Sequence, residues 1–388
     1  MGRSDVESLT RFCENKLATL EERAQRRHLV ETVRLPGGQV RRANRVLCDL
    51  SSNDSLGLCF HPAVRTAAAD AAERYGTGAG ASRLVSGNHP LFAALEQRLA
   101  HHKRADAALV VSSGYLANLG LLPALACARD TILVDERAHA CLHAGARLAG
   151  AAVVVFAHNN LVAVKCGLEE AASRGGRVLV VTESVFSMDG DRAPLPHLAA
   201  LCRAHDAWLI VDDAHGFLVS PDQPTTCDDA TVVTGSLSKA SASVGGYVAG
   251  PRPLIDLLCS RARPLVYSTG LPPAAVAAAT TSMDVAEQQG PPLMGAPREH
   301  ALRFCHAVGL PPPESHIVPL LAGGEDDEHR ALGLMEALID EGFLAVAIRP
   351  PTVPRGTSRL RLSFSAAHDE EQVLHLAAVV RRRWSPRT

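Results

Sequence analysis

The sequence predicts an α/β protein whose central sheet is mostly parallel. Short runs rich in Val, Ile and Leu recur along the chain and alternate with stretches typical of helices. This alternation is the pattern of parallel strands joined by right-handed crossover connections. From about residue 300 the order changes to helix, strand, helix, strand pair and helix. This second pattern predicts a smaller α+β lobe at the C-terminal end.

Composition limits the classes of function that the chain can have. Its 388 residues suffice for a large α/β unit with an appended lobe, and 47% of them are hydrophobic, enough for a sizeable core. The formal net charge of -2 offers no basic surface to nucleic acid, so no nucleic acid partner is expected. The ten cysteines are scattered and lack zinc-binding spacing, so we expect no metal site.

The sequence also bears on where the protein works. No apolar run reaches the length needed to cross a membrane. The polar, charged beginning of the chain lacks the apolar segment of a signal peptide. Together with the scattered thiols, these features predict a cytoplasmic protein with no membrane partner.

The first 75 residues predict helices on either side of a short strand. Residues 4–34 are rich in Glu, Arg, Leu and Ala and predict a helix, which a Pro-Gly-Gly turn at 36–38 follows. Residues 46–50 predict a strand that leads into Asn53. A second helix is expected from Pro62 through Tyr75.

Apolar runs predict the strands of the main sheet. They occupy residues 108–112, 131–135, 153–156, 178–181, 207–211, 232–233 and 244–250. Further helices are expected at 90–102, at 253–262 and over a long stretch from Pro272.

Two polar side chains follow successive strands of this sheet. Asp212 ends one apolar run, and Lys239 follows Val232-Val233 after small and hydroxyl residues. Open α/β sheets bind ligands at the carboxyl ends of their strands. A lysine amine forms a Schiff base with a carbonyl, and an aspartate keeps a pyridine nitrogen protonated so that the ring accepts electrons. Lys239 alone would be an ordinary loop lysine, but the two residues together are the pairing that pyridoxal 5′-phosphate (PLP) requires.

A phosphate site is expected where the strand at 108–112 runs into a helix. Backbone N–H groups at a helix N-terminus bind phosphate. Ser113, Gly114 and Tyr115 occupy this position and are the candidates for the cofactor phosphate. Taken alone, they would more often form an ordinary helix cap than a phosphate site.

Several motifs, in a characteristic order, give the chain its resemblance to a known family. On these motifs it resembles the α-oxoamine synthases, which are fold-type I PLP-dependent transferases with an aspartate aminotransferase-like fold. The closing runs, Ile348 to Pro354 and Arg359 to Leu362, are similar to the 8-amino-7-oxononanoate synthase branch. The other motifs are Ser52 to Leu58, Gly76 to Gly87, Ser113 to Asn118, Glu183 to Asp191, Asp212 to His215, Ser236 to Lys239 and Tyr267 to Thr269.

The resemblance implies a role for each residue around the cofactor. Lys239 holds the PLP aldehyde and later takes the α-proton of the amino acid, while His139 stacks on the ring. Asp212 pairs with the ring nitrogen, and His215 contacts the phenolic oxygen; these four are the expected catalytic residues. The remaining expected cofactor-binding residues are Ser113, Gly114, Tyr115, Glu183, Ser187 beside the phenolic oxygen, Ser236, and, from a neighbouring subunit of a homodimer, Ser268 and Thr269.

Two residues are expected to hold the amino acid substrate. The resemblance implies Asn53 and Arg349. Arg349 follows an apolar run at 343–348 that predicts one strand, and two prolines after it restrict the backbone. A guanidinium held in this way suits a carboxylate. The alternative is an exposed arginine at the rim of the small lobe.

The implied reaction is a decarboxylative condensation of an amino acid with an acyl thioester. L-Alanine with a pimeloyl thioester of coenzyme A or a carrier protein, as in biotin synthesis, is the specific expectation. A related synthase of secondary metabolism, another fold-type I enzyme such as an aminotransferase, and a non-catalytic partner subunit are the alternatives. The sequence departs from the family at the shortened segment 217–224 and at Phe92, where histidine is common. Both departures leave the acyl substrate open.

The motifs also suggest a division of the chain into three parts. Residues 1–50 are expected to form an N-terminal helical arm, and residues 51–270 the large PLP-binding domain. Residues 271–388 are expected to form an interdomain helix and the small C-terminal domain.

Overall fold

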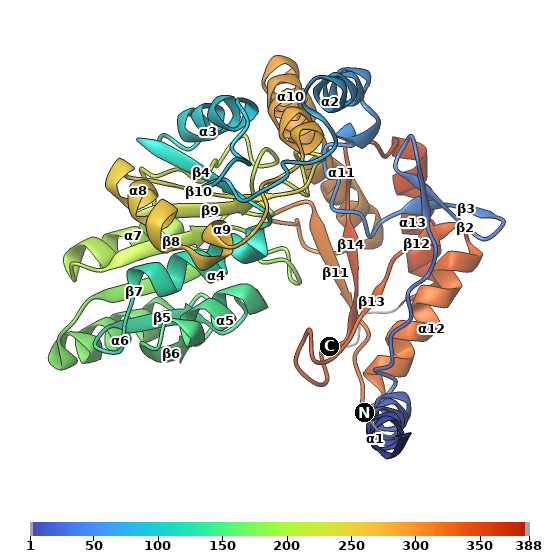
Figure 1. The fold of residues 1–388 in the computed structure, drawn as a ribbon. Helices are drawn as coiled ribbons and strands as arrows, with labels where there is room; N and C mark the ends of the chain where they lie inside the picture. Colours follow the sequence, from blue (N-terminus) through green and yellow to red (C-terminus); the bar gives the residue numbers. More distant parts are fainter. Residues whose placement is uncertain (1–2, 385–388) are drawn as a thin grey trace.

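The computed structural model describes residues 3–384, which form a large and a small lobe (Figure 1). A seven-stranded sheet lies at the centre of the large lobe, in the order β4-β10-β9-β8-β7-β5-β6. Only β10 runs antiparallel to its neighbours, so the predicted mostly parallel sheet is confirmed. The strands are β4 (Ala107–Val111), β5 (Thr131–Asp135), β6 (Ala152–Phe156), β7 (Val178–Glu183), β8 (Trp208–Asp212), β9 (Val232–Ser236) and β10 (Gly246–Gly250).

Helices cover both faces of this sheet because its strands are apolar on both sides. In β5, Ile132 and Val134 pack into one core and Leu133 packs into the opposite one. Alternate side chains of a strand point to opposite faces, so one short run serves two helical layers. The surrounding helices are α3 (Leu91–His102), α4 (Gly114–Leu125), α5 (Ala140–Leu148), α6 (Leu161–Arg174), α7 (Leu195–Ala204), α8 (Arg252–Arg261) and α9 (Arg263–Val266).

The small lobe is built on a three-stranded antiparallel sheet, in the order β11-β14-β13. Phe304 and Phe364 lie in its core, with ring centroids 5.3 Å apart. A long helix, α10 (Pro273–Gln289), precedes this lobe and packs against α2 (Pro62–Tyr75) and α3. The other elements are β11 (Ile317–Leu321), β13 (Ala347–Ile348), β14 (Arg359–Ser363), α11 (Pro291–Val308), α12 (Asp327–Asp340) and α13 (Glu370–Arg383).

The N-terminal segment differs from the predicted helical arm. Helix α1 (Arg3–Glu22) ends twelve residues earlier than expected, and a meander of β1 (Val33–Leu35), β2 (Gln39–Arg42) and β3 (Arg45–Asp49) follows the chain through to residue 49. Strand β3 pairs in parallel with β12 (Phe343–Leu344), so this meander joins the small lobe. The predicted turn at 36–38 and strand at 46–50 both occur, but β1 and β2 were not predicted, and the partner that attaches β3 to the small lobe lies almost 300 residues away.

The apolar run at 343–348 also differs from its prediction as one strand. Its first half, β12, pairs with β3, whereas its second half, β13, pairs with β14 of another sheet. The run therefore crosses from one sheet to the next. A short 3-10 helix, η1 (Leu58–Phe60), precedes α2. Within residues 3–384, no helix combines the length and apolarity needed to cross a membrane.

Candidate active site

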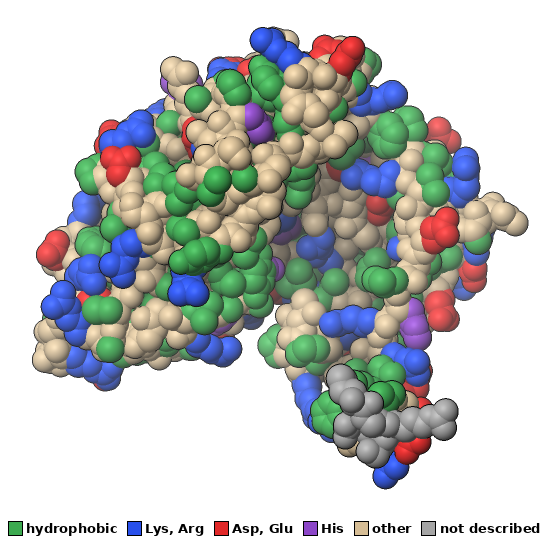
Figure 2. Space-filling view, in the orientation of Figure 1, with side chains coloured by type: hydrophobic (Ala, Val, Ile, Leu, Met, Phe, Trp, Pro, Cys, Tyr) green, Lys and Arg blue, Asp and Glu red, His purple; other side chains and the backbone are tan. Residues whose placement is uncertain are grey.

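The carboxyl ends of three neighbouring strands bring the predicted acids and hydroxyls together. Glu183, Asp212 and Ser236 are the last residues of β7, β8 and β9. Glu183 lies opposite Asp212 in the parallel register, and Asp212 lies opposite Thr234. Because all three strands run the same way, their polar ends meet at one edge of the sheet, as predicted. A hollow between the two lobes shows basic and histidine side chains within it (Figure 2).

Lys239 faces this cluster from the turn after β9. Burial lowers the pKa of its amine, although the charges of Asp212 and Glu183 oppose that change. Burial and the charge of Asp212 raise the pKa of the Glu183 carboxyl, which accepts a hydrogen bond from the His139 backbone N–H at 2.6 Å. A lysine amine with a lowered pKa is a good nucleophile and base.

The other three lysines have different surroundings. Lys103 is buried and its Nζ lies 2.5 Å from Oδ2 of Asp213. Lys165 lies at the surface, 3.8 Å from a carboxylate oxygen of Glu169. Lys16 lies over the ring of Phe12 on α1. Lys103 is already paired, and Lys239 is the lysine that lies within the charges of both Asp212 and Glu183.

The side chain of Asp212 is held firmly at the bottom of the site. Its Oδ1 accepts the backbone N–H of Ala214 at 3.0 Å, and its Oδ2 accepts Nδ2 of Asn118 at 2.6 Å. The ring of His139 lies edge-on to that of Tyr115, with centroids 6.1 Å apart, and its Nδ1 edge is covered by Sγ of Cys141 at 2.9 Å, while the residue as a whole remains exposed. An anchored carboxylate and an open imidazole face match the predicted roles of a ring-nitrogen partner and a stacking group.

Hydroxyls and a helix N-terminus gather beside β9. Ser113 is the N-cap of α4, and its Oγ accepts the backbone N–H of Leu116 at 3.1 Å. Oγ of Ser236 lies 2.7 Å from Oγ of Ser238. A Cβ at Gly114 would lie 3.1 Å from the carbonyl oxygen of Gly235, so glycine allows the helix to begin against the strand end. This arrangement suits a phosphate group.

The small lobe contributes an arginine that the sequence reasoning did not single out. Nη2 of Arg361 donates to Oδ1 of Asn53 at 2.9 Å, and Nη1 donates to the carbonyl oxygen of Ser187 at 3.3 Å. The charge of Arg361 also lowers the pKa values of Lys239 and His215, after the larger effect of burial. Its alternation with Arg359 in β14 was the signal that could have found it.

The predicted substrate arginine lies in other surroundings. Arg349 donates to the backbone carbonyl of Ala24, and burial together with the charge of Arg27 lowers the pKa of its guanidinium. Nη2 of Arg27 donates to Oγ1 of Thr352 at 3.1 Å. Among the residues that the structure describes, Arg349 makes no hydrogen bond with Asn53 or with the residues around Asp212. The structure therefore does not bring Asn53 and Arg349 together.

The predicted dimer residues lie next to this chain's own phosphate site. Thr269 forms a bridge with Ser82, and its carbonyl accepts Oγ of Ser112 at 3.3 Å. Tyr267, just before them, is 76% exposed. Phe92, one of the departures from the family, is buried, and its ring lies beneath the guanidinium of Arg83, 4.0 Å away.

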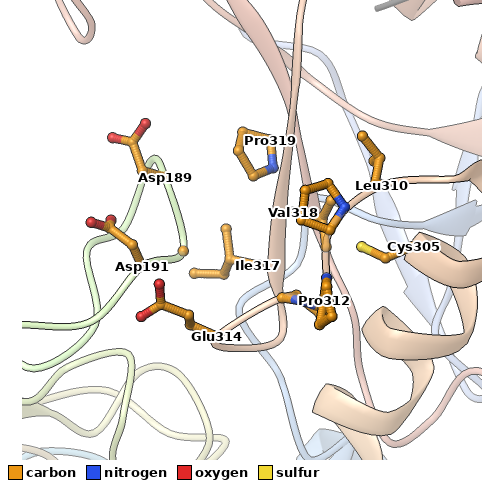
Figure 3. Close-up of a pocket in the computed structure, with 12 residues that line it drawn as sticks. Asp189, Asp191, Cys305, Leu310, Pro312, Glu314, Ile317, Val318 and Pro319 are labelled. Atoms are coloured by element: carbon orange, nitrogen blue, oxygen red, sulfur yellow. The ribbon is translucent and has the colours of Figure 1, made fainter.

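A separate cavity of about 230 Å³ lies between the loop after β7 and the small lobe (Figure 3). Three acidic residues belong to its lining, and each already has a partner: Asp189 pairs with Arg359, Asp191 with His158, and Glu314 accepts the backbone N–H of Arg192. None of the predicted site residues lines it. Within residues 3–384, no group of three or more His, Cys, Asp or Glu side chains is arranged to hold a metal ion.

Comparison with known proteins identifies the family. The model of the aminotransferase class I and II family matches residues 45–380. The chain is 52% identical to an 8-amino-7-oxononanoate synthase of Methylorubrum extorquens (strain PA1) over 378 residues, which cover 97% of this chain and 96% of the relative. An enzyme of the same name from Maricaulis maris is 50% identical, with 96% of each chain covered. This chain belongs to the α-oxoamine synthase family.

Solved structures of serine palmitoyltransferases have the same fold as this α-oxoamine synthase. Serine palmitoyltransferase of Sphingomonas wittichii superposes with a TM-score of 0.86 at 28% identity, covering 98% of this chain and 97% of that one. A variant of the S. paucimobilis enzyme, solved with a bound aldimine of PLP and myriocin, gives a TM-score of 0.85 at 27% identity, covering 97% and 98%. The fold is thus the predicted fold-type I, and the chain is a PLP-dependent acyltransferase.

The residues of this α-oxoamine synthase fit PLP. Lys239 has a lowered pKa and faces two carboxylates, and Asp212 is anchored with its oxygens already oriented. Ser113, Gly114 and Ser236 form a cradle at the helix N-terminus in which a Cβ at Gly114 would be in tight contact with Gly235 and Ser236. Amine, carboxylate and phosphate cradle lie at the same end of adjacent strands, as the three polar parts of PLP require.

Proposed function

We propose that this α-oxoamine synthase joins L-alanine to a pimeloyl thioester, releasing the thiol and carbon dioxide, and so serves biotin synthesis. The observation that carries the proposal is the identity of 50–52% over nearly the whole chain with relatives named 8-amino-7-oxononanoate synthase. A cytoplasmic location stays a prediction.

The residues at the strand ends support this chemistry. When bound, PLP supplies an electron sink that stabilises negative charge on the α-carbon of an amino acid. The lowered pKa of Lys239 leaves its amine able to take the α-proton and to return a proton later. Asp212 offers an anchored carboxylate to the ring nitrogen, and the open face of His139 can stack on the ring.

The phenolic oxygen and the phosphate of PLP each need binding residues of their own. We assign His215 and Ser187 to the phenolic oxygen; His215 is buried, and burial holds its pKa well below its usual value, so its imidazole is neutral. Ser113, Gly114, Tyr115 and Ser236 form the phosphate side. Glu183 holds the backbone of His139 in place by accepting its N–H.

For the substrate carboxylate, we propose Arg361 together with Asn53. Arg361 contacts Asn53 directly, and its charge reaches Lys239. Arg349, the residue predicted from the sequence, is bonded to Ala24 and becomes the second candidate. Arg361→Lys should raise the KM for the amino acid on the order of 10-fold, because a lysine cannot make two parallel hydrogen bonds. Arg349→Lys is the matched control, and a larger rise in that variant would return the role to Arg349.

We propose a homodimer whose sites contain residues of both chains. Exposed apolar side chains at the N-terminal end, among them Phe12, Leu29 and Val30, suit a partner surface. Thr269 bonds to Ser112 of its own chain, so by the family resemblance Ser268 and Thr269, next to an exposed Tyr267, would contact the partner's phosphate where the two sites face each other across the interface. Mixing inactive Lys239→Ala and Thr269→Ala chains should restore part of the activity. A fully active monomer would contradict shared sites.

The decisive experiment is a screen of amino acids against acyl thioesters with purified holoenzyme. L-Alanine with pimeloyl-coenzyme A or a pimeloyl carrier protein should release thiol and carbon dioxide together. Keto acid formation without thiol would indicate an aminotransferase. Faster turnover with another acyl chain would move the enzyme to secondary metabolism.

A further inference from the structure

A buried amide lies behind the strand-end cluster, and none of the roles above uses it. Asn118 is on α4, within a motif of the family resemblance, and is fully buried. Its Nδ2 donates to Oδ2 of Asp212 at 2.6 Å and to Sγ of Cys141 at 3.2 Å. Its Oδ1 accepts the hydroxyl of Thr234 at 2.8 Å. The amide therefore connects α4 with β8, β9 and α5.

Chemistry leaves the amide only one orientation. An ionised carboxylate only accepts hydrogen bonds, so the atom of Asn118 that lies 2.6 Å from Asp212 must be the nitrogen. The oxygen then faces Thr234, whose hydroxyl donates to it. Both amide hydrogens and the amide oxygen have partners, so this buried group is fully satisfied and rigid.

The thiol of Cys141 carries the connection on to His139. Sγ of Cys141 lies 2.9 Å from Nδ1 of His139, and the backbone N–H of Cys141 points at the same nitrogen at 3.2 Å. Burial, followed by the charge of Asp212, raises the pKa of the Cys141 thiol to about 12, so the sulfur keeps its proton. Since the backbone N–H already donates to Nδ1, that nitrogen is an acceptor and the thiol donates to it as well.

A definite tautomer follows for the imidazole of His139. With Nδ1 accepting, the neutral ring carries its proton on Nε2. Burial also lowers the pKa of this histidine, which keeps the ring neutral. A neutral imidazole adds no positive charge beside a protonated pyridine ring, so Asp212 can hold that ring in its protonated form.

We propose that Asn118 is a positioning residue that orients two groups with one amide: the carboxylate of Asp212 and, through the thiol of Cys141, the Nε2–H tautomer of His139. This inference rests on the proposed roles of Asp212 and His139, but not on the identity of the amino acid or the acyl thioester.

The first test replaces the amide by a side chain of similar volume, Asn118→Leu. In the holoenzyme the pH midpoint of the visible PLP band should shift by about one unit, since the ring-nitrogen partner is no longer fixed. The kcat should fall on the order of 10-fold to 100-fold, with the KM for the amino acid changed by less than about 3-fold. The other titratable and charged groups that face Asp212, Lys239 and His139 are Glu183, Cys141, His215, His316 and Arg361, and this variant leaves all five in place. An unchanged midpoint and kcat would overturn the proposal.

The second test asks whether the Cys141 side chain acts as a hydrogen-bond donor or only fills space. Cys141→Ser keeps a donor to His139 and should stay within about 3-fold of the wild-type kcat, whereas Cys141→Ala should lose on the order of 10-fold. Cys202→Ala is the matched control, because Cys202 is equally buried, on α7, away from this network. Equal kinetics in Cys141→Ser and Cys141→Ala would remove the thiol from the proposal.

A third measurement uses the protein without its cofactor. The infrared S–H stretching band of Cys141 can be isolated as the difference between wild type and Cys141→Ser. This band should shift in Asn118→Leu, because the hydrogen bond from Nδ2 of Asn118 to Sγ of Cys141 is lost. If Asn118→Leu does not fold, Thr234→Val serves instead, because it removes the hydroxyl that holds the amide oxygen of Asn118. It should shift the same band and the same pH midpoint by a smaller amount. An unmoved band would refute the link. A failed substrate screen alone would concern the proposed reaction and leave these spectroscopic results standing.

Discussion

His158 lies between two carboxylates and is expected to act as a buried cation. Its Nδ1 is 2.9 Å from Oδ1 of Asp135, and its Nε2 is 2.6 Å from Oδ2 of Asp191. Two acceptors require both ring nitrogens to donate. Burial by itself lowers the pKa of His158, but the hydrogen bonds to Asp135 and Asp191 outweigh it and raise the pKa to about 9. The cation thereby ties the loop after β7 to the end of β5.

The size of this effect follows from the shift. From a usual value of about 6.5, the whole shift would correspond to about 3 kcal/mol of unfolding free energy. Solvent at the edge of the cluster screens part of it, which leaves about 2 kcal/mol. The folded pKa lies above the unfolded one, so the stabilisation is fully present below about pH 6.5 and is lost as the pH rises towards about 9.

The assay compares wild type with His158→Gln by denaturant unfolding of the holoenzyme. At fixed protein and PLP concentrations, the difference in unfolding free energy should be constant below about pH 6.5 and fall by about 2 kcal/mol up to about pH 9. His329→Gln is the control, since His329 and Asp326 form an exposed pair that should contribute less than about 0.5 kcal/mol at any pH. A pH-independent difference for His158→Gln would refute the buried cation.

Two further predictions concern the lysines and the ring partner. Lys103→Met should cost about 3 to 5 kcal/mol of unfolding free energy by calorimetry, because it leaves the buried carboxylate of Asp213 unpaired; a loss below about 1 kcal/mol would contradict this. Borohydride should fix the cofactor to the peptide that contains Lys239. A label on Lys103 or Lys165 would show that Lys239 does not form the Schiff base with PLP. Asp212→Asn should still bind PLP, measured by absorbance, but should lose most of its turnover, and near-normal turnover would mean that another residue is the ring partner.

The sequence by itself determined the main sheet and the centre of the site. A strand buried on both faces reads as a continuous apolar run, and β5, β7, β8 and β9 all begin within one or two residues of their predicted ranges. Asp212 and Lys239 follow two such runs directly, so their proximity needs only the rule that parallel strands end at the same edge. Local patterns suffice wherever a site is built from the ends of neighbouring strands.

Contacts between distant segments were decided only by the tertiary structure. The strands at 33–49 attach to the small lobe because β3 pairs with β12, and the apolar run at 343–348 divides because its halves pair with different sheets. Arg361 and Asn118 lie within motifs of the family resemblance, but their own segments do not show which groups they contact. Arg361 enters the site because β14 turns that face toward Asn53, and Asn118 because α4 presents it to β8. Which group a side chain contacts more than 90 residues away depends on how the elements pack together. The periodicity within one element carries no information about that packing.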